Sequence, residues 1–222
     1  MKLSNKIFAI ALLSILLGSC STYYIPNTLN TPLFKEKGDM KASLNVGLSG
    51  FNPQIAYAVD ENIGIMLNGS FTEENNSNSY SNNFLEAGVG YFDTIPETSH
   101  GRFEIYGGAG YGNITIENSR IITQKVNTTR IFIQPAVGIS SDIFDGSFAT
   151  RLVMVNHKQD SISLTNYLFE PAISLGLGYK YLKFTTQFGL SLPMTSIADT
   201  EIDYIPFIFS FGINIDIGKM LK

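Results

Sequence analysis

The feature that most constrains this chain is an alternation of apolar and polar residues that begins near Lys41 and continues almost to the C-terminus. In the segment 204–217, apolar residues occupy every odd position from Ile205 to Ile217, whereas Ser, Gly, Asn and Asp occupy the even positions from 210 to 216. A period of two places successive side chains on opposite faces of a β-strand. Hardly any stretch has the spacing of an amphipathic helix, so the sequence predicts an all-β fold.

Ten such segments follow one another, separated by turn-forming or polar residues. An even number of strands is the rule for single-chain bacterial barrels. We therefore expect an antiparallel up-and-down β-barrel of about ten strands, or of eight if the first hairpin is not part of the wall. The expected strands are 41–50, 54–60, 62–71, 83–92, 102–114, 126–140, 147–157, 167–179, 183–192 and 204–217.

Composition indicates which face of these strands points outward. Only 15% of the residues are charged, compared with about 25% in soluble domains. The polar face consists mostly of Gly, Ser, Ala and Asn, which suit a crowded lumen better than a water-exposed surface. This favours a membrane barrel with its apolar face outward. A soluble lipocalin-like barrel, which would carry a hydrophobic ligand against an inward apolar face, remains the alternative.

Five charged side chains fall on the expected lumen face. Unpaired charges are very costly to bury, so we expect these residues to pair with one another in a structural network that closes the pore. The members of this expected network are Glu86, Glu104, Arg130, Arg151 and Glu170.

Two further features bear on the strands. Pro135 and Pro171 lie inside expected strands, each after a polar residue, and this suggests two equivalent positions such as β-bulges. Four aromatic residues are expected to point outward near the periplasmic strand ends, at the level of the lipid headgroups. These aromatic residues are Tyr91, Phe103, Tyr179 and Phe184.

The links between strands mostly alternate in length, as in barrels with short periplasmic turns and longer outer loops, with the short first link around Asn52 and Pro53 as the exception. The stretch from Thr72 to Ser79 is of low complexity and is expected to be a mobile loop. The expected periplasmic links are 60–62, 93–101, 141–146 and 180–182, and the expected outer loops are 72–82, 115–125, 158–166 and 193–203.

The first residues of the chain have the features of an export signal. Lys2 and Lys6 precede an apolar run over 7–17, which is too short to span a bilayer. The following Leu17-Gly18-Ser19-Cys20 resembles the lipobox of bacterial lipoproteins, and Cys20 is the only cysteine. The resemblance implies cleavage before Cys20 and acylation of its sulfur. We therefore expect a signal peptide over 1–19, a lipidated tether over 20–39 and a barrel domain over 40–222.

Taken together, residues 41–217 resemble the small outer-membrane β-barrel proteins of Gram-negative bacteria, the class of the OmpX-like and OmpW-like barrels and the barrel part of OmpA. This resemblance implies a protein of the bacterial outer membrane with a structural, envelope-integrity or surface-interaction role. The lipid anchor is implied by the lipobox alone, which departs from the best-known members of the class, whose signal peptides are ordinary ones. The partners of the protein would be membrane lipids, at the Cys20 anchor and at the barrel exterior. Without Lys2 and Lys6, 13 basic residues face 19 acidic ones, which is unfavourable for nucleic acid.

Catalysis is not expected. His157, with Asp160, Ser161 and Ser163 after it, is the one set from which a base and a nucleophile could be drawn, as in a lipid A-modifying barrel enzyme. Its spacing matches no defined motif, and a rim histidine among polar loop residues is the simpler interpretation. His100 is interpreted as a turn residue. With two distant histidines and one cysteine, neither a metal site nor a cofactor is expected.

Overall fold

A computed structural model of the protein describes residues 24–75, 78–96, 98–118, 122–194 and 205–220. It is an all-β barrel with ten antiparallel strands in its wall, as predicted. The short helix α2 (Ile217–Met220) follows the last strand. The strands are β1 (Met40–Gly47), β2 (Gly50–Ala58), β3 (Ile63–Asn75), β4 (Asn78–Thr94), β5 (Gly101–Asn118), β6 (Ile122–Ser140), β7 (Phe144–Gln159), β8 (Ile162–Tyr179), β9 (Leu182–Leu190), β10 (Leu192–Pro193) and β11 (Phe207–Asp216).

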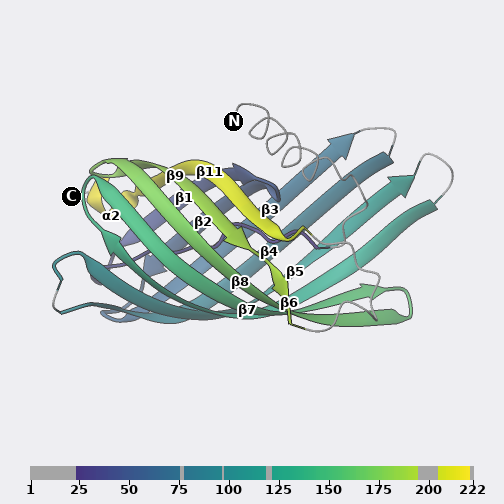
Figure 1. Ribbon diagram of the computed structural model, residues 1–222, viewed down its shortest axis with the longest axis horizontal. Coiled ribbons are helices and arrows are strands. Elements are labelled where there is room, and N and C mark those ends of the chain that lie inside the picture. The colour runs from purple at the N-terminus through teal and green to yellow at the C-terminus, as the bar shows by residue number, and fades with distance from the viewer. Residues whose placement is uncertain (1–23, 76–77, 97, 119–121, 195–204, 221–222) are drawn as a thin grey trace, which may run out of the picture.

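The barrel is closed by pairing between its first and last strands. β1 to β9 pair in sequence order, β9 pairs with β11, and β11 pairs with β1. β10 pairs with β8 in the register that β9 has already set, so it continues β9 and adds no further wall strand. Figure 1 shows the strands tilted strongly around one lumen. The first hairpin belongs to the wall, so the ten-strand prediction is the correct one.

The wall has two heights (Figure 1). β1, β2, β9 and β11 have 8 to 10 residues, about the length that crosses a bilayer. β3 to β8 have 13 to 19 residues. The additional residues extend the wall at the end that carries the β3–β4, β5–β6 and β7–β8 hairpins, called here the hairpin end. The opposite end, with the links after β2, β4, β6 and β8, is called the turn end.

These extensions correct the expected outer loops. The β3–β4 ladder continues from Thr72 paired with Asn82 to Asn75 paired with Ser79, where a mobile loop was predicted. The β5–β6 and β7–β8 pairs likewise continue through most of 115–125 and 158–166. Beyond the bilayer both faces of a strand meet water, so the apolar alternation disappears although the ladder hydrogen bonds persist.

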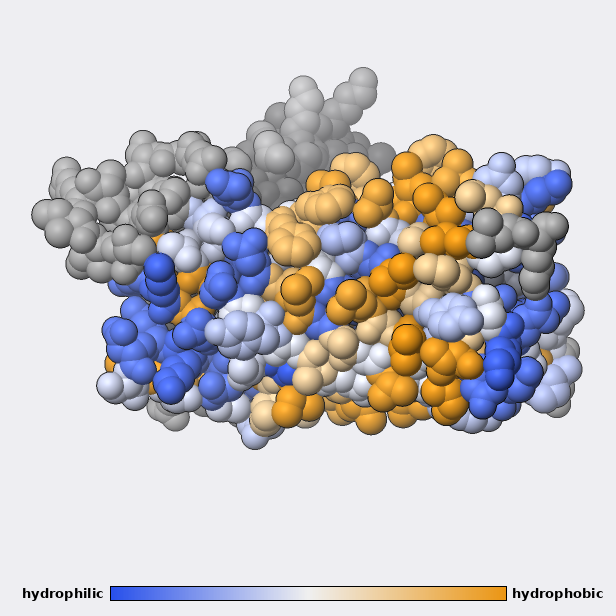
Figure 2. Space-filling view, turned by 180° about the vertical axis from the view of Figure 1, so that it is seen from behind, coloured by the Kyte–Doolittle hydropathy of each residue, from blue (hydrophilic) through white to orange (hydrophobic). Residues whose placement is uncertain are grey.

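The exterior of the barrel is apolar. Leu44, Val89, Ile131 and Phe211 are each more than half exposed on outward positions. Figure 2 shows hydrophobic residues over the middle of the barrel and hydrophilic residues at both ends. The lipocalin-like alternative, which needs the apolar faces inside, is therefore wrong. The outward direction predicted for the four aromatic residues is confirmed, because Tyr91, Phe103, Tyr179 and Phe184 are all 37% exposed or more.

The prolines within strands cause no bulge. Ile133 pairs with Leu152 and Ala136 with Ala149, so the β6–β7 register is the same on both sides of Pro135, while the two intervening pairs are missing. Pro171 lies opposite the break between β9 and β10, and the β8 register is again unchanged. A proline has no N–H to donate, and each gap accommodates that loss without an added residue.

The segment expected to be a tether differs most from its prediction. Residues 24–34 lie inside the barrel, and Tyr24, Asn27, Leu29 and Phe34 are at most 4% exposed. We call residues 24–34 the lumen segment. Its apolar side chains pack against the inner wall, and its backbone forms hydrogen bonds with side chains of the wall. The segment is therefore more buried than an exposed linker would be. Cys20 and the signal peptide lie outside the described residues. Within those residues, no helix is long and apolar enough to span a membrane.

Candidate functional site: the filled lumen

Four of the five charged residues predicted for the lumen meet in one cluster. Arg151 and Glu170 are directly opposite each other on β7 and β8. The Arg151 Nε and Nη2 atoms lie 2.8 and 2.7 Å from Glu170 Oε2. Arg151 Nη1 lies 3.3 Å from Glu86 Oε1, and Arg130 Nη1 lies 3.2 Å from Glu86 Oε2. Two arginines thus neutralise two glutamates, and none of the four side chains is more than 4% exposed.

A glycine on the strand between them allows Glu86 and Arg130 to meet. Gly110 of β5 is the register partner of both Glu86 on β4 and Arg130 on β6. A Cβ atom at Gly110 would lie 2.6 Å from the Phe84 ring and 2.7 Å from Glu86 Cβ. The glycine therefore leaves the space through which these side chains reach across a strand. Gly110 is therefore a closely packed position of the lumen-facing backbone.

Asn27 of the lumen segment lies at the centre of the cluster. Its Oδ1 accepts hydrogen bonds from Arg130 Nη1 at 2.5 Å and from Arg151 Nη2 at 3.0 Å. Its Nδ2 donates to Glu86 Oε1 at 3.1 Å. One amide therefore satisfies both charge types, so the cluster holds the lumen segment as well as the wall.

Tyr24 links the same cluster to the hairpin end of the lumen. Its hydroxyl donates to Glu170 Oε1 at 2.7 Å, and Ser191 Oγ donates to the same oxygen at 3.0 Å. The Arg130 guanidinium lies 5.1 Å from the centre of the Tyr24 ring and 4.3 Å from that of Phe84. These contacts desolvate Arg130 between two aromatic rings, which adds cation–π attraction to the ion pair.

Amide side chains of the wall bind the backbone of the lumen segment as a neighbouring strand would. Gln187 accepts from the Leu29 N–H at 2.8 Å and donates to the Leu29 carbonyl at 3.0 Å. Gln54 donates to the Thr28 carbonyl at 2.7 Å, and Gln134 donates to the Asn30 carbonyl at 2.7 Å. These bonds satisfy backbone groups that are otherwise costly to bury.

Glu104 is not a member of the charged cluster, which corrects the five-residue prediction. It is buried, and its Oε2 accepts from the Leu33 N–H at 2.9 Å. On β5 it lies six positions from Gly110, where the cluster crosses that strand. Six positions correspond to about 20 Å along a strand. The sequence correctly places Glu104 on the lumen face, but alternation does not distinguish levels along the barrel axis.

An apolar layer closes the lumen nearer the turn end. Phe34 is fully buried, and its ring centre lies 5.3 Å from that of Phe92 in an edge-to-face arrangement. Tyr106 also points inward at this level and is fully buried. Phe132 and Val153 point inward too, but they lie beside the charged cluster, where the Phe132 ring centre is 5.9 Å from the Arg151 guanidinium. Large apolar residues on the lumen face are unexpected for a water-filled barrel, but here the lumen segment covers them.

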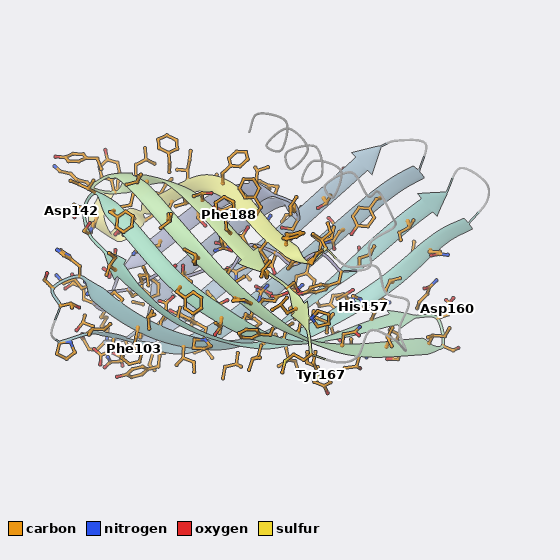
Figure 3. The ribbon with its side chains drawn as sticks, viewed as in Figure 1. Phe103, Asp142, His157, Asp160, Tyr167 and Phe188 are labelled. Carbon is orange, nitrogen blue, oxygen red and sulfur yellow. The ribbon has the colours of Figure 1, made fainter. Side chains whose placement is uncertain are left out.

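The candidate catalytic residues are not brought together. His157 points into the lumen, where its Nδ1 lies 3.0 Å from Thr128 Oγ1. Ser163 is exposed and exchanges hydrogen bonds with Asn156 on the outer face of the wall. Figure 3 shows Asp160 at the tip of the β7–β8 hairpin, away from His157. His100 is an exposed turn residue. Within the described ranges, no cluster of three or more His, Cys, Asp or Glu side chains is arranged to hold a metal ion.

Among the lumen residues that escaped prediction, Asn52 and Gln134 share a sequence signal with Glu170, which was predicted. Three polar residues, each followed by proline, all bind the lumen segment. Asn52 accepts from the Thr28 N–H, Gln134 donates to the Asn30 carbonyl, and Glu170 accepts from Tyr24. The repeated polar–Pro pair was visible in the sequence, but its purpose depends on a partner in the lumen that alternation does not reveal.

Comparison with known proteins adds little. No protein-family model matches the chain, and no curated protein matches it. Among solved structures, CarO2 of Acinetobacter baumannii is similar at 11% identity and a TM-score of 0.31, over 81% of this chain and 98% of that one. At this TM-score the similarity carries no argument. The strand pairing, the apolar exterior and the polar, filled interior themselves define the class, which is the membrane-spanning β-barrel.

Proposed function

We propose that this protein is a lipid-anchored β-barrel of the bacterial outer membrane, with a structural or surface-interaction role and without transport or catalysis. The observation that carries the proposal is that a barrel with an apolar exterior has its lumen filled by its own N-terminal segment. An outer-membrane barrel that transported solutes would need a continuous path. Here the charged cluster and the Phe34 layer both cross that path.

The contacts of the lumen segment favour a permanent closure over a gate. The segment is held at its hairpin-end side by Tyr24, near its middle by Leu29 and Asn30, and at its turn-end side by Leu33. Releasing it would leave Arg130, Arg151, Glu86 and Glu170 without Asn27, and it would uncover the apolar layer. A gate would require a second arrangement that gives the charged cluster and the apolar layer comparable partners.

The lipid anchor in this proposal rests on the lipobox resemblance at Leu17-Gly18-Ser19-Cys20. Membrane lipids would then contact the protein at two places, the acylated Cys20 and the apolar barrel exterior. The long strand extensions at the hairpin end offer polar surface for other molecules, and this is the surface to which we assign the interaction role.

The test is fractionation of a Cys20→Ala variant exported through an ordinary cleavable signal, beside the wild-type chain labelled with radioactive palmitate. We expect palmitate in the wild type only, and both proteins in the outer-membrane fraction with a gel mobility that changes on boiling. A soluble periplasmic variant would contradict the membrane barrel. An unlabelled wild type would contradict the lipid anchor and leave the barrel standing.

A further inference from the structure

The lumen segment runs along the barrel axis in one direction. Its C-terminal part lies at the turn end, where the Phe34 ring approaches Gly64 and Phe92 near the ends of β3 and β4. The chain then turns, and the Gly38 N–H donates to the Ala58 carbonyl at the end of β2. β1 begins at Met40, also at the turn end. The segment therefore leaves the lumen at the turn end before it enters the wall.

The N-terminal part of the segment lies at the hairpin end. The Tyr24 ring lies 6.3 Å from the ring of His157, which is close to the hairpin end of β7. The Tyr24 carbonyl accepts a hydrogen bond of 3.0 Å from the N–H of Ile205, in the link that precedes β11. Tyr24 is thus at the rim of the lumen, on the end opposite to the first residue of β1.

The rim beside Tyr24 is the low part of the wall. Ile205 leads directly into β11, and the strands on this side, β9, β11, β1 and β2, are the short ones. Figure 1 shows them ending well before the long strands that project from the other side. Cys20 is four residues from Tyr24, a reach of at most about 14 Å. That reach suffices to cross a low rim toward the bilayer, but not to return through a filled lumen.

From this geometry we propose that the acylated N-terminus inserts its acyl chains into the membrane leaflet on the hairpin side of the barrel. With the long hairpins outside, this is the outer leaflet at the cell surface. The inference rests on the proposed function for the acylation and on the general rule of long outer hairpins for the orientation. The lumen segment then passes inward from a surface anchor to β1, so the lipid lies on the opposite side of the membrane from the start of the wall.

The test is thiol labelling of cells that carry the full chain, with a maleimide that does not cross membranes. Acylated Cys20 has no free thiol, so new cysteines report their own positions. Ser21→Cys and Thr22→Cys probe the N-terminus. Ser161→Cys marks the tip of the β7–β8 hairpin, and Glu61→Cys marks the β2–β3 link at the turn end. For each protein, labelling in intact cells is divided by labelling after detergent lysis.

We expect Ser21→Cys and Thr22→Cys to give the high ratio of Ser161→Cys, and Glu61→Cys to give a ratio near background. N-terminal ratios as low as that of Glu61→Cys overturn the inference while leaving the barrel in place. Labelling of the wild type would show an unacylated Cys20, and equal ratios for Ser161→Cys and Glu61→Cys would show that the barrel does not span. Either result refutes the proposed function and the inference with it.

Discussion

Replacing Arg151 by Met removes the cation that holds the charged cluster together, at nearly the same side-chain volume. Arg151 is fully buried, and it makes two bonds to Glu170, one ion pair to Glu86 and two hydrogen bonds to Asn27. Glu86 keeps Arg130 as a counter-ion. Glu170 keeps only the hydroxyl groups of Tyr24 and Ser191, so its charge stays buried without a cation.

Breaking a buried ion pair by removing one partner costs about 3–5 kcal/mol, and we expect a loss of that size for Arg151→Met. Adding Glu170→Gln to Arg151→Met gives a double variant in which the negative charge left without a counter-ion is removed. The double variant should then be more stable than the sum of the single losses predicts, by about 1–3 kcal/mol. Lys158→Met, an exposed change on the same strand, should alter stability by about 0.5 kcal/mol or less.

The chain has no tryptophan, so unfolding by urea is best followed through the mobility of unheated samples on gels, after refolding into lipid vesicles. The free energies of unfolding of the wild type, Arg151→Met, Glu170→Gln and the double variant together give the coupling energy between Arg151 and Glu170. A loss below about 1 kcal/mol for Arg151→Met, or strictly additive losses, would refute the claim that this pair is buried and mutually dependent.

Three further outcomes are expected. Leu67→Arg, on the outward face of β3 about midway across the bilayer, should lower the free energy of unfolding in vesicles by about 2–4 kcal/mol. Ser81→Arg, opposite Glu73 in the polar extension of the same hairpin, should change it little, and equal effects would contradict the assigned membrane span. Phe34→Ala should cost about 3–5 kcal/mol in the same urea assay, and a loss under about 1 kcal/mol would mean that the apolar layer is not packed. Deleting 24–34 should produce ion conductance in planar bilayers where the wild type has none, and a silent deletion protein would show that the wall closes without the segment.

Much of the wall could be predicted because it depends on local pattern. A face that meets lipid must be apolar at every second position, so the alternation from Phe207 to Ile213 fixes both the strand and its outward face. The same argument correctly directs Glu86, Arg130, Arg151 and Glu170 inward. Strand ends were less predictable. Beyond Thr72 both faces of β3 are polar, and the hydrogen bonds of the ladder, which continue there, leave no pattern in the sequence.

The contents of the lumen could not be predicted in this way. Nothing in residues 24–34 alternates, and their prolines and polar residues are those of a linker. Their partners are distant along the chain, as with Tyr24 and Glu170, which are separated by 146 residues. Alternation also places the large Tyr106 and Phe132 on the lumen face, but it gave no means of identifying the lumen segment that fills the space beside them.

The position of the lumen segment also dictates an order of assembly. The segment precedes β1 in the chain, whereas the barrel is completed only when β11 pairs with β1. The wall begins at one end of the segment, and under the proposed function a lipid is attached near the other end, so threading the segment through a finished ring would require moving acyl chains past the Arg151 cluster. The sheet must instead curl around a segment already in place, so Asn27 and Leu29 can act as a template on which the later strands, up to β9 and β11, are gathered.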